Sequence, residues 1–322
     1  MVCGNPDARV EGVQVDVLRK LVDGERALRT WLWISLVCNM GIIVTGAVVR
    51  LTGSGLGCPT WPRCTDESYV PHEAYGIHGV IEFGNRLLTF VLVAAALGAF
   101  IAAWRNRGRG STLWWITLGV GLGIPLQAIV GGITVLTSLD PSWVAPHLLL
   151  SIVLIVVCVW ALRVGYGTAP TPVAPGARWL VIATFAASMT SIVVGTVVTG
   201  AGPHAGDAAA PRNGADIESV ARLHSLSAWL VVALVVACVW LFSRTGQRRP
   251  ARAARLTLIT VALQGVIGYA QYFLGLPVGI VILHMVGLTV LTAAVSWLLV
   301  STTRSARAHQ PGPDHRPSLH AS

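Results

Sequence analysis

The sequence predicts an all-α integral membrane protein in which eight transmembrane helices form two parallel, pseudo-symmetric four-helix bundles. Three observations support this prediction. The 322 residues are 54% hydrophobic and only 11% charged, with a mean hydropathy of +0.67, which lies outside the range of ordinary soluble domains. Eight apolar stretches are each long enough to cross a bilayer as a helix, at roughly 20 residues per span. The two halves of the chain also resemble each other over gap-free segments.

The eight stretches follow one another with polar connections between them. They lack the strict alternation of a membrane β-strand, and backbone polar groups in lipid must be satisfied within the segment, so we interpret all eight as helices. They are predicted near residues 31–50, 77–103, 113–136, 144–162, 179–200, 219–242, 256–274 and 280–300.

The positive charges are unevenly distributed along the chain. Most of the 23 Lys and Arg residues lie before the first span, in the connections after the second, fourth and sixth spans, or in the C-terminal tail. Basic connections stay on the cytoplasmic side, so both termini are predicted to be cytoplasmic, with the protein in the cell membrane. The net charge of +9 then reflects contact with anionic membrane lipid and requires no nucleic acid.

The third and fourth spans align without a gap on the seventh and eighth. The alignment places Gln127, Gly131 and His147 over Gln264, Gly268 and His284, each pair 137 residues apart. The first and fifth spans are also similar, as "VTGAVVRLTGSG" and "VVGTVVTGAGPH", although chance similarity of two apolar tracts stays open there. Each half has four spans, so both halves enter the membrane with the same orientation, as expected for a duplication.

These features divide the chain into five segments. They are a cytoplasmic N-terminal tail (1–30), an N-terminal four-helix half (31–162), a cytoplasmic linker (163–178), a C-terminal four-helix half (179–300) and a disordered cytoplasmic tail (301–322). The final segment is polar and rich in proline, as is typical of disorder.

Four of the nine histidines lie in the even-numbered spans, near the predicted outer surface: His78, His147, His224 and His284. A single membrane histidine can simply hydrogen-bond to a neighbouring helix. Four at matching depth favour ligation of a metal. Facing histidines on two helices of a bundle are what an axially bis-ligated haem requires, because each imidazole supplies one nitrogen.

A polar stripe opens the second span. His78, Glu82, Asn85 and Arg86 fall on one helix face, so this face is predicted to point away from lipid. A carboxylate on this face could take a proton or position water, or it could simply pair with Arg86 four residues on. Arg86, and also Arg50 and Arg222, could hold haem propionates, although snorkelling to the membrane surface would place them equally well.

The first outer connection contains two cysteines, Cys58 and Cys64, within "TGSGLGCPTWPRC". They face the oxidising side, where a disulfide that closes a small loop is reasonable, and two free thiols are the alternative. The remaining cysteines are isolated and are interpreted as a tail residue and three packing residues.

The motifs "GSGLGCPTWPRC" and "IEFGNRLL", together with histidines on the even spans, resemble those of the haem A synthase family, and the resemblance covers nearly the whole chain. It implies an enzyme that converts one ring methyl of haem O to a formyl group by two successive oxidations, with loss of water from a geminal diol. It also implies haem b held between His224 and His284, and haem O received by the N-terminal half. Glu82 matches the glutamate that acts at the substrate methyl, and Cys58 and Cys64 match the pair above that pocket.

The resemblance further implies haem O synthase and assembly factors of the terminal oxidase as partners. One position departs from the family. Asn85 stands where many relatives have a histidine ligand, and the internal repeat also makes Asn85 the equivalent of His224. We therefore predict His147 as a ligand on the substrate side, with His78, about 10 Å from Asn85 along the helix axis, as a second ligand only if the haem lies nearer the outer surface.

Two other classes of protein would use part of this pattern. A dihaem electron carrier would need the same histidines but neither Glu82 nor a haem-sized entrance. A transporter would exploit the repeat, but its spans should be broken near the midplane, and Pro125 is expected to be the only interior proline in the first seven spans.

Overall fold

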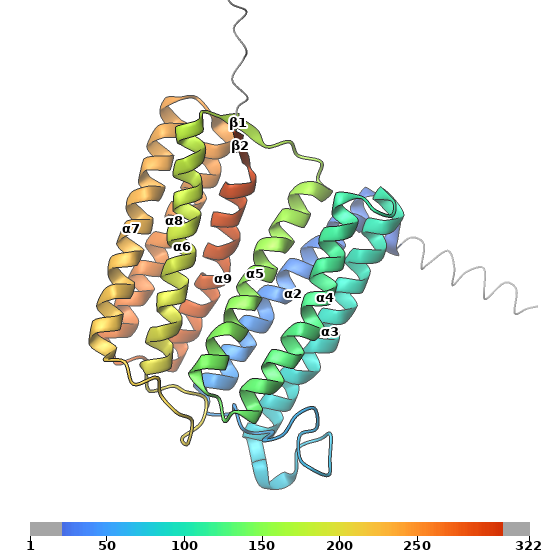
Figure 1. Ribbon diagram of the computed structural model, residues 1–322, viewed down its shortest axis with the longest axis vertical. Helices are drawn as coiled ribbons and strands as arrows, with labels where there is room; N and C mark the ends of the chain where they lie inside the picture. Colours follow the sequence, from blue (N-terminus) through green and yellow to red (C-terminus); the bar gives the residue numbers. More distant parts are fainter. Residues whose placement is uncertain (1–20, 305–322) are drawn as a thin grey trace, which may run out of the picture.

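The computed structural model describes residues 21–304 and, over that range, contains eight long helices that account for the predicted spans (Figure 1). They are α2 (Glu25–Leu51), α3 (Gly76–Arg107), α4 (Thr112–Leu136), α5 (Pro141–Gly165), α6 (Pro175–Ala201), α7 (Ile217–Arg244), α8 (Arg248–Phe273) and α9 (Val278–Val300), with a short helix η1 (Glu73–Tyr75) before α3. All eight are long and apolar enough to cross a membrane, so the predicted all-helical class is confirmed. Predictions for residues 1–20 and 305–322 lie outside the described residues.

Several helices extend beyond the apolar stretches that predicted them. The clearest case is α8, which begins at Arg248 and not near residue 256. Its added turns are rich in Arg and Ala, which are strong helix formers but contribute no hydrophobic pattern. The expectation of a single interior proline was wrong, because α5 contains Pro146 as α4 contains Pro125. Both helices continue through their prolines without interruption.

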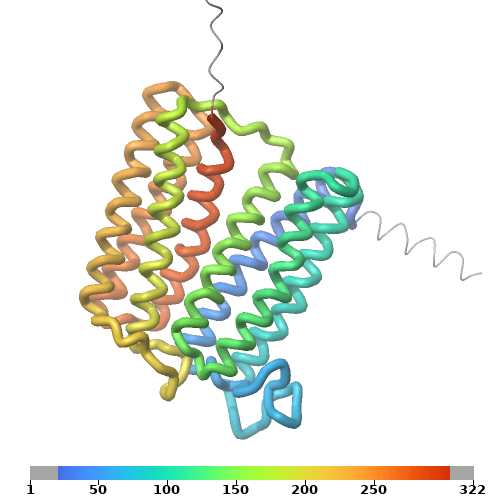
Figure 2. The backbone as a smooth tube through the Cα atoms, viewed as in Figure 1, coloured from blue at the N-terminus to red at the C-terminus, as the bar shows by residue number. Residues whose placement is uncertain are grey.

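The helices form two groups of four. In what we call the first unit, α2, α3, α4 and α5 pack in sequence and α5 closes against α2. In the second unit, α6, α7, α8 and α9 pack in sequence and α9 closes against α6 (Figure 2). The units meet mainly through α9, which packs against α2 and α5. The eight helices therefore lie side by side in one slab, as a membrane requires.

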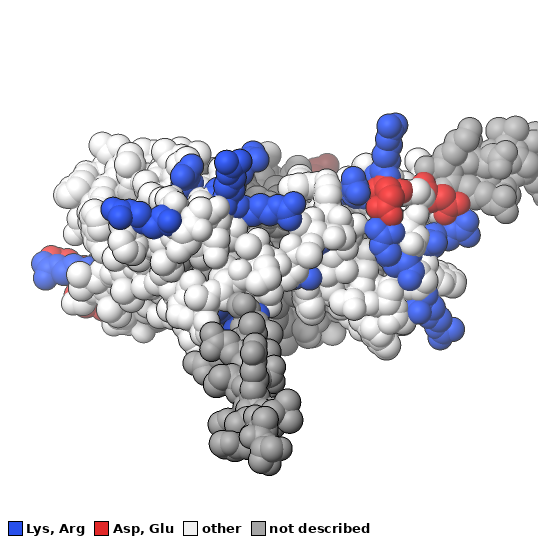
Figure 3. All heavy atoms as spheres, turned by 90° about the horizontal axis from the view of Figure 1, so that it is seen from above, with Lys and Arg blue, Asp and Glu red and all other residues white. Residues whose placement is uncertain are grey.

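The two ends of the slab differ. At the strand end, β1 (Thr171–Val173) pairs in parallel with β2 (Thr302–Arg304), so the segment before α6 is tied to the segment after α9 (Figure 1). Both ends of the described chain lie here. Among the described residues, Arg side chains gather over this end, above both units (Figure 3). The opposite end, which we call the loop end, carries the long connections 52–72 and 202–216.

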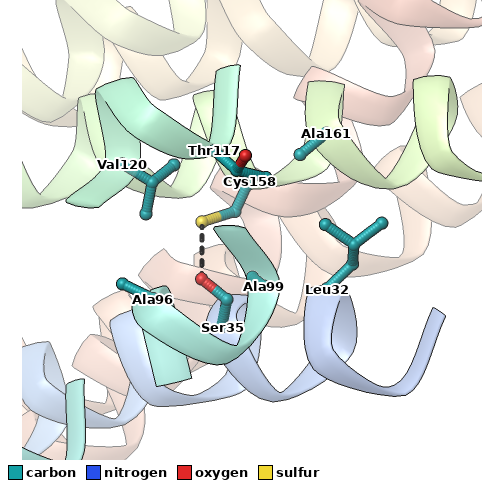
Figure 4. Close-up of a pocket in the computed structure, with 8 residues that line it drawn as sticks. All are labelled: Leu32, Ser35, Ala96, Ala99, Thr117, Val120, Cys158 and Ala161. Carbon is teal, nitrogen blue, oxygen red and sulfur yellow. Dashed lines mark hydrogen bonds between the residues drawn. The ribbon is translucent and has the colours of Figure 1, made fainter. Parts of the chain in front are cut away.

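The close-packed apolar core lies mainly in the strand-end half of each unit. Its largest cluster includes Leu28, Leu32, Leu113, Ile155 and Leu162 of the first unit, and Val181, Cys238, Phe242 and Leu298 form the core of the second. Figure 4 shows the centre of the first unit, where Ser35 and Cys158 meet beside a cavity of about 10 Å³, which holds at most about one water. The four membrane histidines lie away from this close-packed region, toward the loop end.

Candidate functional site

A disulfide-closed loop covers the start of α3. Cys58 and Cys64 form the disulfide and are both buried, so the predicted pairing is confirmed and the alternative of two thiols is wrong. Gly57 packs directly on the backbone of His78, and the Trp61 ring packs on Gly132 of α4, so a Cβ on either glycine would clash. The loop is thereby seated on both α3 and α4.

Beneath the loop lies a buried ion pair. Glu82 is 5% exposed, and its Oε1 accepts hydrogen bonds from Arg86 Nη2 at 2.6 Å and Nε at 3.2 Å. Its Oε2 accepts from the backbone N–H of Cys58 at 2.7 Å. Arg86 also donates to the carbonyl oxygens of Cys58, Thr60 and Arg63. The pairing four residues apart that the sequence allowed is present, and it anchors the disulfide loop to α3.

The other two members of the predicted stripe have separate partners. Asn85 Oδ1 accepts a hydrogen bond from Thr45 Oγ1 of α2 at 2.8 Å. His78 is exposed in the first turn of α3, with its Nδ1 2.9 Å from Ser54 Oγ. The stripe therefore divides into an inner part, around Asn85, and an outer part that supports the loop.

The second unit brings two histidine rings together in an edge-on arrangement. The ring centroids of His224, on α7, and His284, on α9, are 6.5 Å apart, with an angle of 78° between the ring planes. His224 Nδ1 lies 3.0 Å from the backbone oxygen of Ser191 on α6, a contact that sets which ring nitrogen is left for another partner. His284 Nδ1 is buried and has no hydrogen-bond partner among the described residues.

His147 and His284 occupy matching environments. Gln127 Nε2 donates to the backbone oxygen of His147 at 3.1 Å, and Gln264 Nε2 donates to that of His284 at 2.9 Å. In the same way, Gly131 faces the His147 ring and Gly268 faces the His284 ring. Like His284, His147 has a buried Nδ1 without a partner in the part of the chain that the structure describes.

The remaining two predicted arginines lie elsewhere. Arg50 donates from Nε to the backbone oxygen of His204 at 2.6 Å and from Nη2 to that of Thr199 at 2.8 Å, so it joins α2 to the second unit at the loop end. Arg222 pairs with Glu218 on an exposed face of α7. It is two residues from His224, and residues at that spacing do not share a helix face.

Sequence reasoning missed three residues that position these side chains: Ser54, Thr45 and Ser191. Ser54 lies in a loop whose path no periodic pattern predicts, and Ser191 acts through a backbone carbonyl, which leaves no signal in the residue type. Thr45 could have been found, because it lies beside Gly46 in the "VTGAVV" segment that aligns with "VVGTVV" around Gly195.

Fold and site together define a class: an eight-span membrane protein of two four-helix units, one with a pair of neighbouring histidines and the other covered by a disulfide-closed loop. Within that class the chain belongs to the COX15-CtaA family, because the model of that family, described as cytochrome oxidase assembly protein, matches residues 29–296. The match includes residues of all eight helices.

Relatives of this chain include heme A synthases and a protoheme IX farnesyltransferase. The heme A synthase of Rhizorhabdus wittichii is 24% identical over 84% of this chain and 92% of its own length. The heme A synthase of Bacillus cereus strain AH187 is 30% identical over 36% of this chain and 37% of its own, and a protoheme IX farnesyltransferase of Halobacterium salinarum strain NRC-1 is 28% identical over 40% of this chain and 29% of its own. The chain is a heme A synthase family enzyme, as the resemblance implied.

Proposed function

We propose that the protein oxidises a ring methyl of haem O to a formyl group in the first unit, with haem b in the second unit as its electron-transfer cofactor. The observation that carries the proposal is the buried Glu82 beneath the Cys58–Cys64 loop, in a chain matched by the family over nearly its full length. A buried carboxylate at the loop end, on the face that leads to Asn85, is suited to chemistry on a large apolar substrate.

The second unit fits haem b. A metal–imidazole bond of about 2 Å places the centres of two rings on opposite sides of one iron about 6 Å apart. The distance of 6.5 Å between the centroids of His224 and His284 matches this requirement. The unpartnered Nδ1 of His284 further supports a polar ligand in this space. Haem b bound there would supply one-electron transfer.

In the first unit, His147 is the proposed ligand of the substrate iron, and Glu82 is the proposed base or water-positioning group. Each oxidation of the methyl carbon releases protons, and a carboxylate held by Arg86 and the Cys58 amide keeps a fixed position in which to accept one. Arg86 already uses all three guanidinium nitrogens on Glu82 and loop carbonyls, so its main role is to hold this geometry. Propionate contacts of Arg50 and Arg222 stay predictions.

We further propose that the strand end is cytoplasmic and the loop end extracytoplasmic. The arginines gathered at the strand end support this orientation, as does a disulfide at the opposite end (Figure 3). The two units then correspond to the predicted halves, and haem O synthase and oxidase assembly factors are the expected partners in the same membrane.

The test is to produce the full-length protein in a host that makes haem O but no haem A, purify it, and separate its extracted haems by reversed-phase chromatography. Haem A or its hydroxylated precursor beside haem b is the expected result. Haem b alone, with added haem O neither bound nor changed, would contradict the proposal and favour an electron carrier.

A further inference from the structure

We propose that the first unit holds the iron of its substrate through one protein side chain, His147, and that Asn85 leaves the opposite side of the iron without a protein ligand. This inference rests on the proposed function and specifies how the substrate is bound. Four observations support it, and the first two compare the units directly.

The ligand side is the same in both units. His147 and His284 each have their backbone oxygen bound by a glutamine side chain twenty residues earlier, and each ring lies against a glycine of the preceding helix. In both, Nδ1 is buried without a partner among the described residues. His147 therefore occupies the position of a ligand.

The opposite side differs. In the second unit, His224 of α7 packs against α6, and a Cβ placed on Gly195 would lie 3.1 Å from His224 Cε1. In the first unit, Asn85 of α3 contacts the equivalent stretch of α2 through Thr45. A Cβ placed on Gly46, which aligns with Gly195, would meet no atom within 4 Å. The space that an imidazole fills in the second unit is open in the first.

Asn85 does not replace the missing ligand. Its side-chain oxygen is engaged by Thr45 Oγ1 at 2.8 Å, and a neutral amide is not among the side chains that hold haem iron in proteins. The short side chain also ends well before the position that an imidazole would reach.

His78 does not replace it either. It lies seven residues before Asn85, about 10 Å away along the helix axis. The same offset in the second unit reaches Ile217, the first residue of α7, where the unit has no ligand. Moreover, His78 is exposed and its Nδ1 contacts Ser54. It supports the loop end and not the centre of the unit.

A haem whose iron has one protein ligand can leave its site more readily than a haem whose iron has two. Such a site suits an enzyme that must take in a haem substrate and release a haem product. It also leaves a coordination position that a small external molecule can occupy. The second unit, with two ligands, is built to retain its haem.

The experiment uses the full-length protein purified with haem O from a host that makes no haem A, and reads the spin state of the ferric haems by electron paramagnetic resonance. We expect a low-spin signal from the second unit and a separate high-spin signal from the first. Asn85→His should convert the high-spin signal to low-spin, His147→Ala should remove it together with most of the haem O, and His78→Ala should leave it unchanged. Added imidazole should convert the high-spin signal in the unmodified protein, which provides a test that needs no variant.

Low-spin signals from both haems, one of which becomes high-spin in His78→Ala, would overturn the inference while leaving the proposed function intact. Haem O bound with the expected high-spin signal but never oxidised would leave the inference standing and contradict the proposed function. Failure of imidazole to change the high-spin signal would also overturn the inference, because the open position would then not exist.

Discussion

The two units pack four helices in the same order but carry different polar side chains toward the loop end. In the second unit, the rings of His224 and His284 lie edge-on to each other with their centroids 6.5 Å apart. In the first unit, His147 has an asparagine across from it, and a buried glutamate lies beneath a disulfide-closed loop. The connection at the same place in the second unit, residues 202–216, contains no cysteine. If the proposed function holds, the comparison teaches that a small change in side chains separates a site that retains a haem from one that processes it.

The largest expected effect comes from removing one of the two neighbouring histidines of the second unit. His284→Ala should abolish most haem b binding, because one of the two proposed iron ligands is lost, while haem O still enters the first unit. The haem b content of the purified protein measures this. His72→Ala, which changes an exposed histidine before η1, is the control and should retain haem b. Full haem b content in His284→Ala would contradict the proposal that His284 holds haem b in the second unit.

Glu82→Gln tests the chemistry assigned to the first unit. Turnover should fall by roughly 10²–10⁴, the usual contribution of a general base, while the haem b content is unchanged. The measurement is the amount of oxidised haem formed per protein in the haem O host. Glu218→Gln changes an exposed glutamate in the first turn of α7 and serves as the control. Normal product formation in Glu82→Gln would show that the buried glutamate only supports the loop.

The ion pairs at the starts of α3 and α7 allow a direct comparison, since both join residues four apart. Arg86→Met should destabilise the protein by about 3 kcal/mol, because it leaves the buried Glu82 carboxylate without its cation. Arg222→Met breaks an exposed pair, with side chains 74% and 57% exposed, and should cost about 0–1 kcal/mol.

Thermal unfolding in detergent, followed by tryptophan fluorescence, measures the difference between these two variants. Adding Glu82→Gln to Arg86→Met should recover part of the lost stability, because the uncompensated charge is removed. Equal losses of stability in the two single variants would mean that the buried pair is no more important than the exposed one.

The smallest effect concerns two aligned glycines. Gly195→Ala should lower the Tm, because the new methyl group lies 3.1 Å from His224 Cε1 and must displace the ring. Gly46→Ala should leave the Tm unchanged or raise it, because the space is open and alanine favours the helix. A larger drop in Tm for Gly46→Ala than for Gly195→Ala would contradict the inference that the space beside Gly46, across from His147, is open.

The sequence predicted some of these features well for identifiable physical reasons. The eight spans were predictable because the bilayer sets the length of the apolar stretches. The matched positions of His147 and His284 were predictable because a fixed offset of 137 residues relates them. Cys58 and Cys64 were paired correctly because only a short loop separates them.

Other features depend on the three-dimensional fold and could not be predicted from the sequence. The helical turns before residue 256 carry arginines, which hydrophobicity does not detect. The contacts of Arg86 with three loop carbonyls depend on how residues 58–63 fold back over α3. The hydrogen bonds from Arg50 to backbone oxygens of the second unit are also indicated by no pattern in residue types.

The parallel pairing of β1 with β2 has a consequence for how such a chain can be assembled. Because the strand before α6 lies against the strand after α9, the chain enters and leaves the second unit at the same point. A segment with adjacent ends can be copied in tandem, or cut and rejoined in a different order, without rerouting the rest of the polypeptide. The second unit therefore begins and ends at one place, and a single connecting segment, between α5 and α6, joins it to the first unit.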